Sequence, residues 1–544
     1  MTSEEYIINE LERYLKNANI TNVPIVLNKP KEEEHGDFAS NLAMQLAGIL
    51  KKKPREIADE ICNFIRRDQK YISKIEIAGP GFINFFAANE NLFQQLDLLL
   101  KAGHEYGKSN IGSGEKAMVE FVSANPTGPL TIGHGRQAVL GDTIANLLET
   151  IGYQVTREYY FNNAGRQMRI LGNSVKLRYL ELLGETITFP EDHYQGEYII
   201  DIARDLIEKY SDSLKNKEDV TVFKDAAEQA IFENIKSTVN RLGFSFDVFY
   251  NENSLYETGK INEVIEALNS KGFIEKRDGA TWFLTTKLGS DQDRVFVKSS
   301  GEPTYRLPDT AYHIEKVKRG FDLIIDIFGA DHIATYPDVL SALDVLGYPV
   351  EHIKVLIHQF VTLTEGGEKV KMSTRKANFV TLDELMDEVG VDVTRYFFLM
   401  RQMNAHLNFD LALAKTQSDE NPVFYIQYAH ARICSIIALA GERGIALEKS
   451  RDLTVLTEIS EINLIKYLIA FPGTVESSAI SYEPHRLVGY LFDLATMFHK
   501  FYTECRVIND EPVLTQARLA LIDATRIVIA NGLKILGITA PDKM

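Results

Sequence analysis

The stretch Ala117–Gln137, AMVEFVSANPTGPLTIGHGRQ, decides how the rest of the chain is interpreted. It opens with an apolar, partly β-branched run at 118–122 that predicts a buried strand. A loop broken by proline and glycine follows, and Gly133-His134-Gly135 then lead into a segment with helical spacing at 137–150. Because the entrance of a helix carries unpaired N–H groups and the positive end of the helix dipole, this strand–loop–helix unit predicts a phosphate site.

The same residues also fit the loose dinucleotide fingerprint, as Gly133-x-Gly135-x-x-Ala138. That fingerprint should follow its strand directly and find an acidic partner about 20 residues further on. Here a loop with Pro126 and Pro129 separates strand from helix, and Glu158 lies a little too far along the chain. A nicotinamide-binding fold is therefore the weaker interpretation.

Length and composition limit the class of protein. The 544 residues suggest three or four domains of about 150 residues each. The net charge of −17 repels nucleic acid on average, so any RNA contact must use local basic patches. Three scattered cysteines predict neither a disulfide framework nor a cysteine zinc site, and we expect a cytoplasmic protein without a protein-bound metal. The acidic N-terminal helix is not a signal peptide, and we expect no contact with a membrane.

Periodicity predicts a multidomain α/β protein. Residues 1–110 indicate an α+β domain, with a strand at 23–27, a hairpin at 75–86, and helices at 4–16, 39–51, 55–66 and 90–101. Residues 111–382 alternate strands and helices, which predicts a Rossmann-like parallel sheet with sites at the carboxyl ends of its strands. A charged helical segment at about 167–250 is typical of an insertion. Residues 383–544 are nearly all helical and predict a C-terminal bundle.

Three motifs in the α/β part suit nucleotide binding without a phosphate-binding glycine loop of the Walker type. They are Gly133-His134-Gly135, then Gly329-Ala330-Asp331-His332 after an apolar strand, and then Lys371-Met372-Ser373-Thr374-Arg375-Lys376. Three cations within one short loop suit the clamping of a polyphosphate while charge develops on it. Each motif alone is a weak signal, but their order and spacing together are a strong one.

With the motifs TIGH, GADH and KMSTR in this order, the chain resembles the class I aminoacyl-tRNA synthetases, and over its whole length the arginyl-tRNA synthetase family. The similarity extends to SANPTGPLTIGHGRQA, REYYFNNAGRQ, TYRLPDTAYH and VKMSTRKANFVTLDEL. The resemblance implies that the carboxylate of L-arginine attacks the α-phosphate of ATP, giving arginyl-adenylate and pyrophosphate. A ribose hydroxyl at the 3′ end of tRNA(Arg) then takes the arginyl group. Mg²⁺ would accompany the ATP.

The resemblance also implies roles for single residues. Catalysis would be positioning and stabilisation of phosphate charge by His134, Lys371, Ser373 and Arg375. The residues implied to bind ATP are Thr131, Gly133, His134, Gly135, Gly329, Asp331, His332, Lys371 and Met372.

A site that binds arginine should contain carboxylates, because a guanidinium is a planar fork that prefers bidentate, partly desolvated acceptors. By resemblance, Glu120 or Asn125 would meet the α-amino and carboxylate end. Tyr305 and Asp309, at helical spacing on one face, would meet the guanidinium. Without the resemblance, Asp309 would be interpreted as a helix cap or a surface acid, since Pro308 precedes it.

Two departures from the family pattern concern the catalytic rate. Thr131 replaces the first histidine of the HIGH signature, and Thr374 stands where KMSK has its second lysine. Lys371, Arg375 or Lys376 must then supply that charge. These changes leave open a catalytically weakened paralogue that binds tRNA. The family further implies an N-terminal domain on the tRNA elbow, an anticodon-binding bundle, and a monomer.

Overall fold

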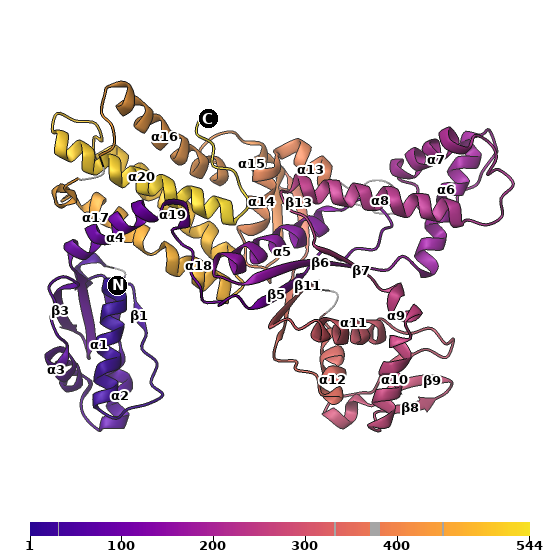
Figure 1. The fold of residues 1–544 in the computed structure, drawn as a ribbon, viewed down its shortest axis with the longest axis horizontal. Coiled ribbons are helices and arrows are strands. Elements are labelled where there is room, and N and C mark those ends of the chain that lie inside the picture. Colours follow the sequence, from indigo (N-terminus) through magenta and orange to yellow (C-terminus); the bar gives the residue numbers. More distant parts are fainter. Residues whose placement is uncertain (31, 331–332, 370–380, 449–450) are drawn as a thin grey trace.

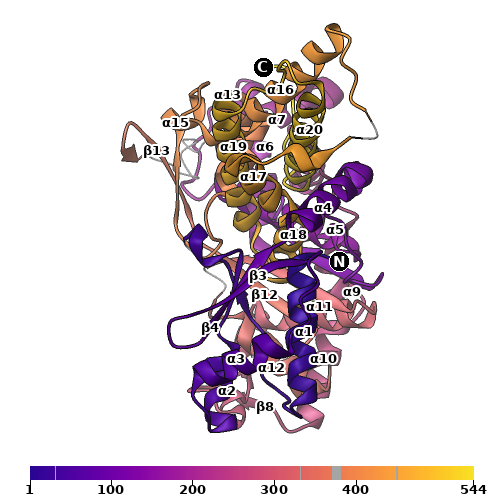
Figure 2. The same ribbon diagram turned by 90° about the vertical axis from the view of Figure 1, so that its left-hand side faces the viewer.

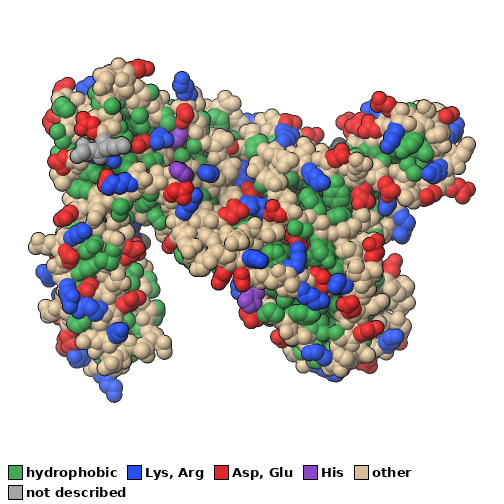
Figure 3. Space-filling model, viewed as in Figure 1, with side chains coloured by type: hydrophobic (Ala, Val, Ile, Leu, Met, Phe, Trp, Pro, Cys, Tyr) green, Lys and Arg blue, Asp and Glu red, His purple; other side chains and the backbone are tan. Residues whose placement is uncertain are grey.

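The computed structural model describes residues 1–30, 32–330, 333–369, 381–448 and 451–544. Figure 1 shows a parallel sheet at the centre of the molecule, with a helical arm extending to one side. On the other side the C-terminal helices lie above the N-terminal domain. Acidic and basic side chains are interspersed over the face seen in Figure 3, so the negative net charge is not gathered into one stripe there.

The central sheet has the order β12-β11-β5-β6-β7, and every neighbouring pair is parallel. Its strands are β5 Lys116–Glu120, β6 Gln154–Phe161, β7 Val248–Asn251, β11 Leu323–Gly329 and β12 Ile353–His358. Parallel strands bring their carboxyl ends to one edge, where ligands bind in open α/β sheets. The predicted Rossmann-like sheet is confirmed. The strand β7 lies at the end of the 167–250 segment, so the sheet resumes within the range expected to be insertion.

Each face of the sheet has its own hydrophobic core, because successive side chains of a strand point to opposite faces. Ala117 and Val119 of β5 belong to the core that includes α5 (Ile132–Thr150), whereas Met118 belongs to the core on the other side. Figure 1 shows α5 above the sheet and α11 and α12 below it. The elements of the lower side are α9 Asn253–Glu257, α10 Lys260–Ser270, β8 Ile274–Arg277, β9 Ala280–Phe283, β10 Arg294–Val297, α11 Arg306–Lys318 and α12 Tyr336–Leu346.

The arm at the right of Figure 1 consists of α6 Gly165–Leu182, α7 Glu197–Tyr210 and α8 Thr221–Arg241. Its long helix α8 runs back to the sheet and meets α13 (Leu382–Val389), where Arg241 donates to Asp383 across 2.5 Å. The helical character predicted for this segment is confirmed.

The N-terminal domain has an antiparallel sheet of order β1-β2-β4-β3 beside its helices, as the view in Figure 2 shows. Its elements are α1 Ser3–Asn17, β1 Leu27–Asn28, β2 Phe38–Ser40, α2 Leu42–Leu50, α3 Pro54–Phe64, β3 Ile72–Ala78, β4 Phe82–Ala87 and α4 Asn89–Ala102. The predicted hairpin is β3–β4. The strand predicted at 23–27 is wrong: pairing begins only at Leu27, after Pro24, which has no N–H to donate to a neighbouring strand.

The C-terminal part begins with a small sheet and continues as a bundle. Its elements are β13 Val361–Glu365, β14 Glu368–Lys369, α13 Leu382–Val389, α14 Val391–Leu399, β15 Leu407–Asp410, α15 Leu411–Lys415, α16 Pro422–Glu442, α17 Ile459–Ile469, α18 Phe471–Ile480, α19 Pro484–Glu504 and α20 Pro512–Ile535. The bundle is confirmed. Among the described residues α16 alone is long and apolar enough to cross a membrane, but it packs on α19 and α20 inside the bundle.

Candidate active site

The phosphate site predicted at a helix entrance lies at the start of α5, and this helix begins earlier than the periodicity predicts. It starts at Ile132, with Thr131 as its N-cap, so the GHG motif forms its first turn. The Thr131 N–H donates to Nδ1 of His134 across 3.1 Å, and this bond fixes the ring at the helix entrance. Burial lowers the pKa of His134 to about 4. The ring is therefore neutral at pH 7, accepts at Nδ1, and keeps its proton on Nε2 for donation to a ligand.

The two glycines of this turn have different surroundings. Gly133 is exposed, and among the described residues a Cβ there would meet only Thr131 Oγ1, at 3.7 Å. Gly135 is buried, and a Cβ there would lie 2.6 Å from a methyl carbon of Leu382 and 3.1 Å from the ring of Phe398. Gly133 thus leaves the entrance open, whereas Gly135 lets α13 and α14 approach the helix closely.

The other motifs predicted to bind ATP are linked to α5 as far as the structure describes them. Gly329 ends β11, the neighbour of β5, and Gln137 of α5 donates to the Ile327 carbonyl of the same strand. Thr381 forms a bridge with Thr131 at the N-cap of α5. The remaining predicted residues, Asp331, His332, Lys371, Met372, Ser373 and Arg375, lie outside the described residues.

Glu120, the last residue of β5, is buried and already bonded. Its Oε1 accepts from the hydroxyl of Ser123 at 2.8 Å, and its Oε2 accepts from the ammonium of Lys316. The chain turns sharply after it, because Val122 and Ser123 take φ values of 69° and 43°. A β-branched residue in the left-handed region is strained, and such strain is concentrated at functional sites.

Asp309 lies in the first turn of α11 and is largely withdrawn from solvent, so it is neither the helix cap nor a surface acid. The N-cap of α11 is Tyr305. Burial raises the pKa of Asp309 to about 7, and the carboxylates of Glu252 and Glu120 contribute in the same direction. The Tyr305 side chain is 80% exposed. Although the two residues share one turn, the structure does not bring their side chains together.

Glu252, which the sequence did not single out, is the third acid of a cluster with Glu120 and Asp309. It follows β7, is 6% exposed, and accepts from the Tyr160 hydroxyl and the Asn162 amide, each at 2.8 Å, and from Tyr256 at 3.3 Å. Burial raises the pKa of its carboxyl. The sequence signal for Glu252 was its position directly after a strand of the parallel sheet. This signal was missed because most of β7 lies inside the range predicted to be an insertion.

Asn125 is linked to this acid cluster through Asn162. It is exposed, and its Oδ1 accepts from the Asn162 N–H at 3.1 Å. The side-chain amide of Asn162 in turn donates to Glu252. The ends of β5, β6 and β7 thus hold Asn125, Glu120 and Glu252 on one side, and α11 holds Asp309 on the other.

Glu158, the acid that a dinucleotide fingerprint would need, is bonded within the protein. It is fully buried on β6, accepts from the Tyr312 hydroxyl at 2.5 Å, and forms an ion pair with Arg319. Its carboxylate is therefore not available for a ribose, which argues against the nicotinamide interpretation.

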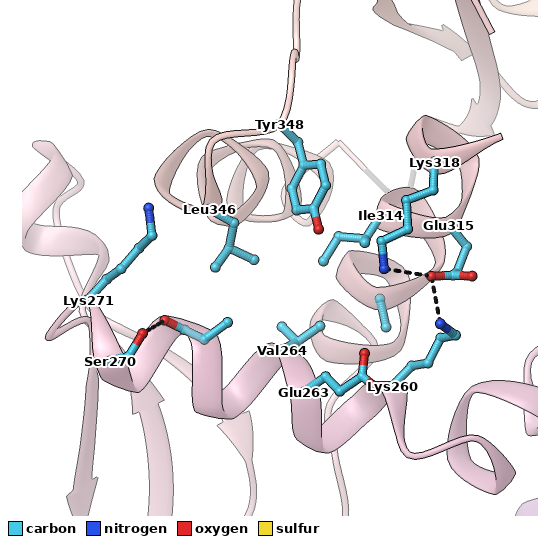
Figure 4. A pocket seen from close by; sticks show the side chains of 12 residues that line it. Lys260, Glu263, Val264, Ser270, Lys271, Ile314, Glu315, Lys318, Leu346 and Tyr348 are labelled. Carbon is cyan, nitrogen blue, oxygen red and sulfur yellow. Dashed lines mark hydrogen bonds and ion pairs between the residues drawn. The ribbon is translucent and has the colours of Figure 1, made fainter. Parts of the chain in front are cut away.

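A separate cavity of about 240 Å³ lies on the opposite face of α11, between α10 and α12 (Figure 4). Lys260 and Lys318 both reach into it and both bind Glu315, at 3.0 and 3.2 Å. None of the predicted site residues within the described part of the chain lines this cavity, and its closest charges neutralise one another.

One group of potential metal donors occurs among the described residues outside the pocket. His430 and Cys434, one turn apart on α16, lie with Asp542 so that their donor atoms are within 4.8 Å of one another. They are bonded as they stand: His430 Nδ1 is 2.9 Å from the Pro541 carbonyl, and the Cys434 thiol donates to Asp542. These bonds fasten the C-terminal tail to α16.

Comparison with known families finds three matches along the chain. Residues 4–87 match the family "Arginyl tRNA synthetase N terminal domain". Residues 95–405 match "tRNA synthetases class I (R), catalytic domain", and residues 426–544 match "DALR anticodon binding domain". A curated arginine–tRNA ligase of Desulfotalea psychrophila is 54% identical over 517 residues, which are 95% of this chain and 94% of that protein.

The chain belongs to the arginyl-tRNA synthetase family. A further arginine–tRNA ligase of this family, from Pelodictyon phaeoclathratiforme, is 51% identical over 99% of this chain and 100% of its own length. The resemblance inferred from TIGH, GADH and KMSTR is confirmed, and the protein is an ATP-using aminoacyl-tRNA ligase.

Solved structures of arginyl-tRNA synthetases share the fold. One from Campylobacter jejuni is 32% identical, has a TM-score of 0.77, and covers 83% of this chain and 99% of its own. One from Thermus thermophilus is only 21% identical, yet has a TM-score of 0.78 and covers 99% of both chains. The predicted three-part architecture is confirmed.

Proposed function

We propose that this protein joins L-arginine to ATP as arginyl-adenylate, releases pyrophosphate, and transfers the arginyl group to the 3′ end of tRNA(Arg). Full-length similarity to arginine–tRNA ligases supports this assignment. The observation that carries it is the pair Asp309 and Glu252: a partly buried and a buried carboxyl whose pKa values are raised and to which no basic side chain of the described chain is bonded. A guanidinium supplies the missing positive charge and the matching planar fork.

In this proposal arginine lies along the carboxyl ends of β5, β6 and β7. Asp309 and Glu252 bind the guanidinium, and Tyr305 covers it from the solvent side. Glu120 and Asn125 bind the α-amino and carboxylate end, which directs the carboxylate towards the start of α5. Lysine fits this pocket less well, because a compact ammonium cannot satisfy two carboxylates through a planar fork.

ATP, taken as its Mg²⁺ complex, lies with its phosphates at the first turn of α5 and its adenosine near Gly329. His134 is neutral and donates from Nε2 to a phosphate oxygen, and the N–H groups of Gly133 and its neighbours add the helix dipole. Thr131 acts here by capping the helix, so the first signature histidine is replaced without loss of the entrance geometry. The predicted cations Lys371 and Arg375, together with Ser373 and Met372, are assigned to the phosphates from sequence alone.

The flanking parts serve the tRNA. Residues 1–110 contact its elbow, residues 111–382 perform the chemistry, and residues 383–544 read the anticodon through stacking and edge hydrogen bonds. The enzyme works as a monomer in the cytoplasm. The weakened, tRNA-binding paralogue is the less supported alternative, because the helix entrance and the acid pocket are both intact.

The test is arginine-dependent ATP–pyrophosphate exchange, with and without tRNA(Arg), and with lysine as the control amino acid. We expect exchange with arginine when tRNA is present and none with lysine. Asp309→Ala should lower kcat/KM for arginine at least about 30-fold, equivalent to about 2 kcal/mol, because Glu252 alone then faces the guanidinium. Lack of exchange under every condition, with tRNA still bound, would favour the paralogue.

A further inference from the structure

Lys316, on α11, is a fully buried lysine beneath the acid pocket. It is 0% exposed, its ammonium donates to Glu120 and, across 2.5 Å, to Asp326 of β11, and it lies 4.2 Å from the centre of the Tyr312 ring. Every contact of the ammonium is therefore with the protein. Lys316 can therefore affect a bound substrate only through the carboxylates to which its ammonium donates.

The cluster around Lys316 pairs basic side chains with carboxylates. His313 lies with Nδ1 at 2.7 Å from the Asp309 carbonyl and Nε2 at 2.9 Å from Asp326. The Lys316 ammonium and the His313 ring thus face the carboxylates of Glu120 and Asp326. A buried carboxylate that lost its cation would take up a proton instead.

Glu120 still has free acceptor sites in this arrangement. An ionised carboxylate offers about four lone-pair positions, and Ser123 and Lys316 occupy one on each oxygen. The unused positions belong to the last residue of β5, at the strand edge where arginine is placed.

We propose that Lys316 is a positioning residue for arginine: it keeps the Glu120 carboxylate ionised and fixed, so that Glu120 can bind the α-ammonium of the substrate. This inference rests on the proposed function. It predicts that loss of Lys316 weakens recognition of the α-ammonium specifically, and leaves the guanidinium contacts of Asp309 and Glu252 in place.

The experiment compares the full-length enzyme with Lys316→Met, which keeps an unbranched side chain one atom shorter and removes the charge. Lys318→Met is the matched control, since Lys318 lies on the opposite face of the same helix and is 48% exposed. The readouts are the KM values for arginine and for ATP in tRNA-dependent exchange. The inhibition constant of 5-guanidinopentanoate, which is arginine without its α-amino group, is measured alongside them.

We expect Lys316→Met to raise the KM for arginine at least about tenfold, with the KM for ATP and the inhibition constant of the analogue within about twofold. Lys318→Met should leave all three unchanged. If Lys316 acted only through packing, its loss would weaken the binding of arginine and of the analogue together. That result would overturn the proposal.

A charge-balanced double variant, Lys316→Met/Asp326→Asn, covers the case in which the single variant fails to fold. It removes one cation and one anion, yet leaves Glu120 without its lysine. The KM for arginine should therefore still rise while the inhibition constant of the analogue stays nearly unchanged. Normal arginine KM in the double variant would show that Lys316 only neutralises Asp326. If the wild-type enzyme shows no arginine-dependent exchange, the proposed function fails. If the wild-type enzyme exchanges and the variants bind both arginine and the analogue more weakly, only this inference fails.

Discussion

Buried and partly buried carboxylates in the described part of this protein fall into two groups. Several are held by a basic side chain, as Glu158 is by Arg319 and Glu461 is by Arg518. Glu252 and Asp309 have no such partner among the described residues, and burial raises the pKa of both. Because an unpaired buried charge is unfavourable by several kcal/mol, these two carboxyls suit the cationic ligand of the proposed function.

This charge state gives a prediction for arginine binding. The pKa of Asp309 in the empty pocket is raised to about 7, so below that pH the carboxyl is mostly protonated. A bound guanidinium favours the ionised form, so binding should release up to one proton at pH 6 and almost none at pH 8.5. The affinity should fall about tenfold per pH unit below 7. Calorimetry in two buffers of different ionisation enthalpy measures this release.

Glu252→Gln provides the check on this assignment. It removes a neighbouring negative charge that raises the pKa of Asp309, so the midpoint of proton release should move to lower pH. Equal release at pH 6 and pH 8.5 in the wild-type protein would contradict the role given to Asp309.

At the scale of elements, the site depends on two helices packed closely on the sheet. The inner face of α11 carries Asp309, Tyr312, His313 and Lys316, and its outer face lines the separate cavity of Figure 4. The helix α5 approaches β5 equally closely: a Cβ on Gly141 would lie 2.2 Å from the ring of Phe121. A glycine is needed there because any side chain at this position would overlap the Phe121 ring.

Gly141→Ala should therefore destabilise the catalytic domain by about 1–3 kcal/mol, since the added methyl overpacks the contact between helix and strand. Gly489→Ala is the matched control, because Gly489 lies inside α19 with no atom within 4 Å of the new methyl. It should stabilise by about 0.5–1 kcal/mol through helix propensity. Thermal denaturation compares the two, and equal melting temperatures would refute the close packing.

Across the whole molecule, Arg395 of α14 links three parts of the chain. Its guanidinium donates to Asp142 of α5 at 2.6 Å, to the Leu242 carbonyl at the end of α8 at 2.7 Å, and to the Leu536 carbonyl at the end of α20 at 2.8 Å. The side chain is 0% exposed. One residue thus joins the catalytic sheet, the helical arm and the C-terminal bundle.

Removal of this link should separate the parts. Arg395→Met should destabilise the junction by about 3–5 kcal/mol, because Asp142 loses a buried partner and two helix ends lose donors. We expect calorimetry to show an earlier, split transition. Arg486→Ala, at a half-exposed arginine of α19, should shift stability by no more than about 0.5 kcal/mol. A single unshifted transition in Arg395→Met would rule out the linking role.

The sequence by itself determined the family, the parallel sheet, the helical bundle and the nucleotide motifs, because these depend on local spacing and on turn residues in order along the chain. Only the tertiary structure decided that α5 starts at Ile132, that Tyr305 is exposed, and that Glu252 lies in one cluster of acids with Asp309. The contact of Lys316 with Glu120 spans 196 residues. Periodicity carries no information about such pairs, since burial and charge balance arise only when distant strands and helices meet.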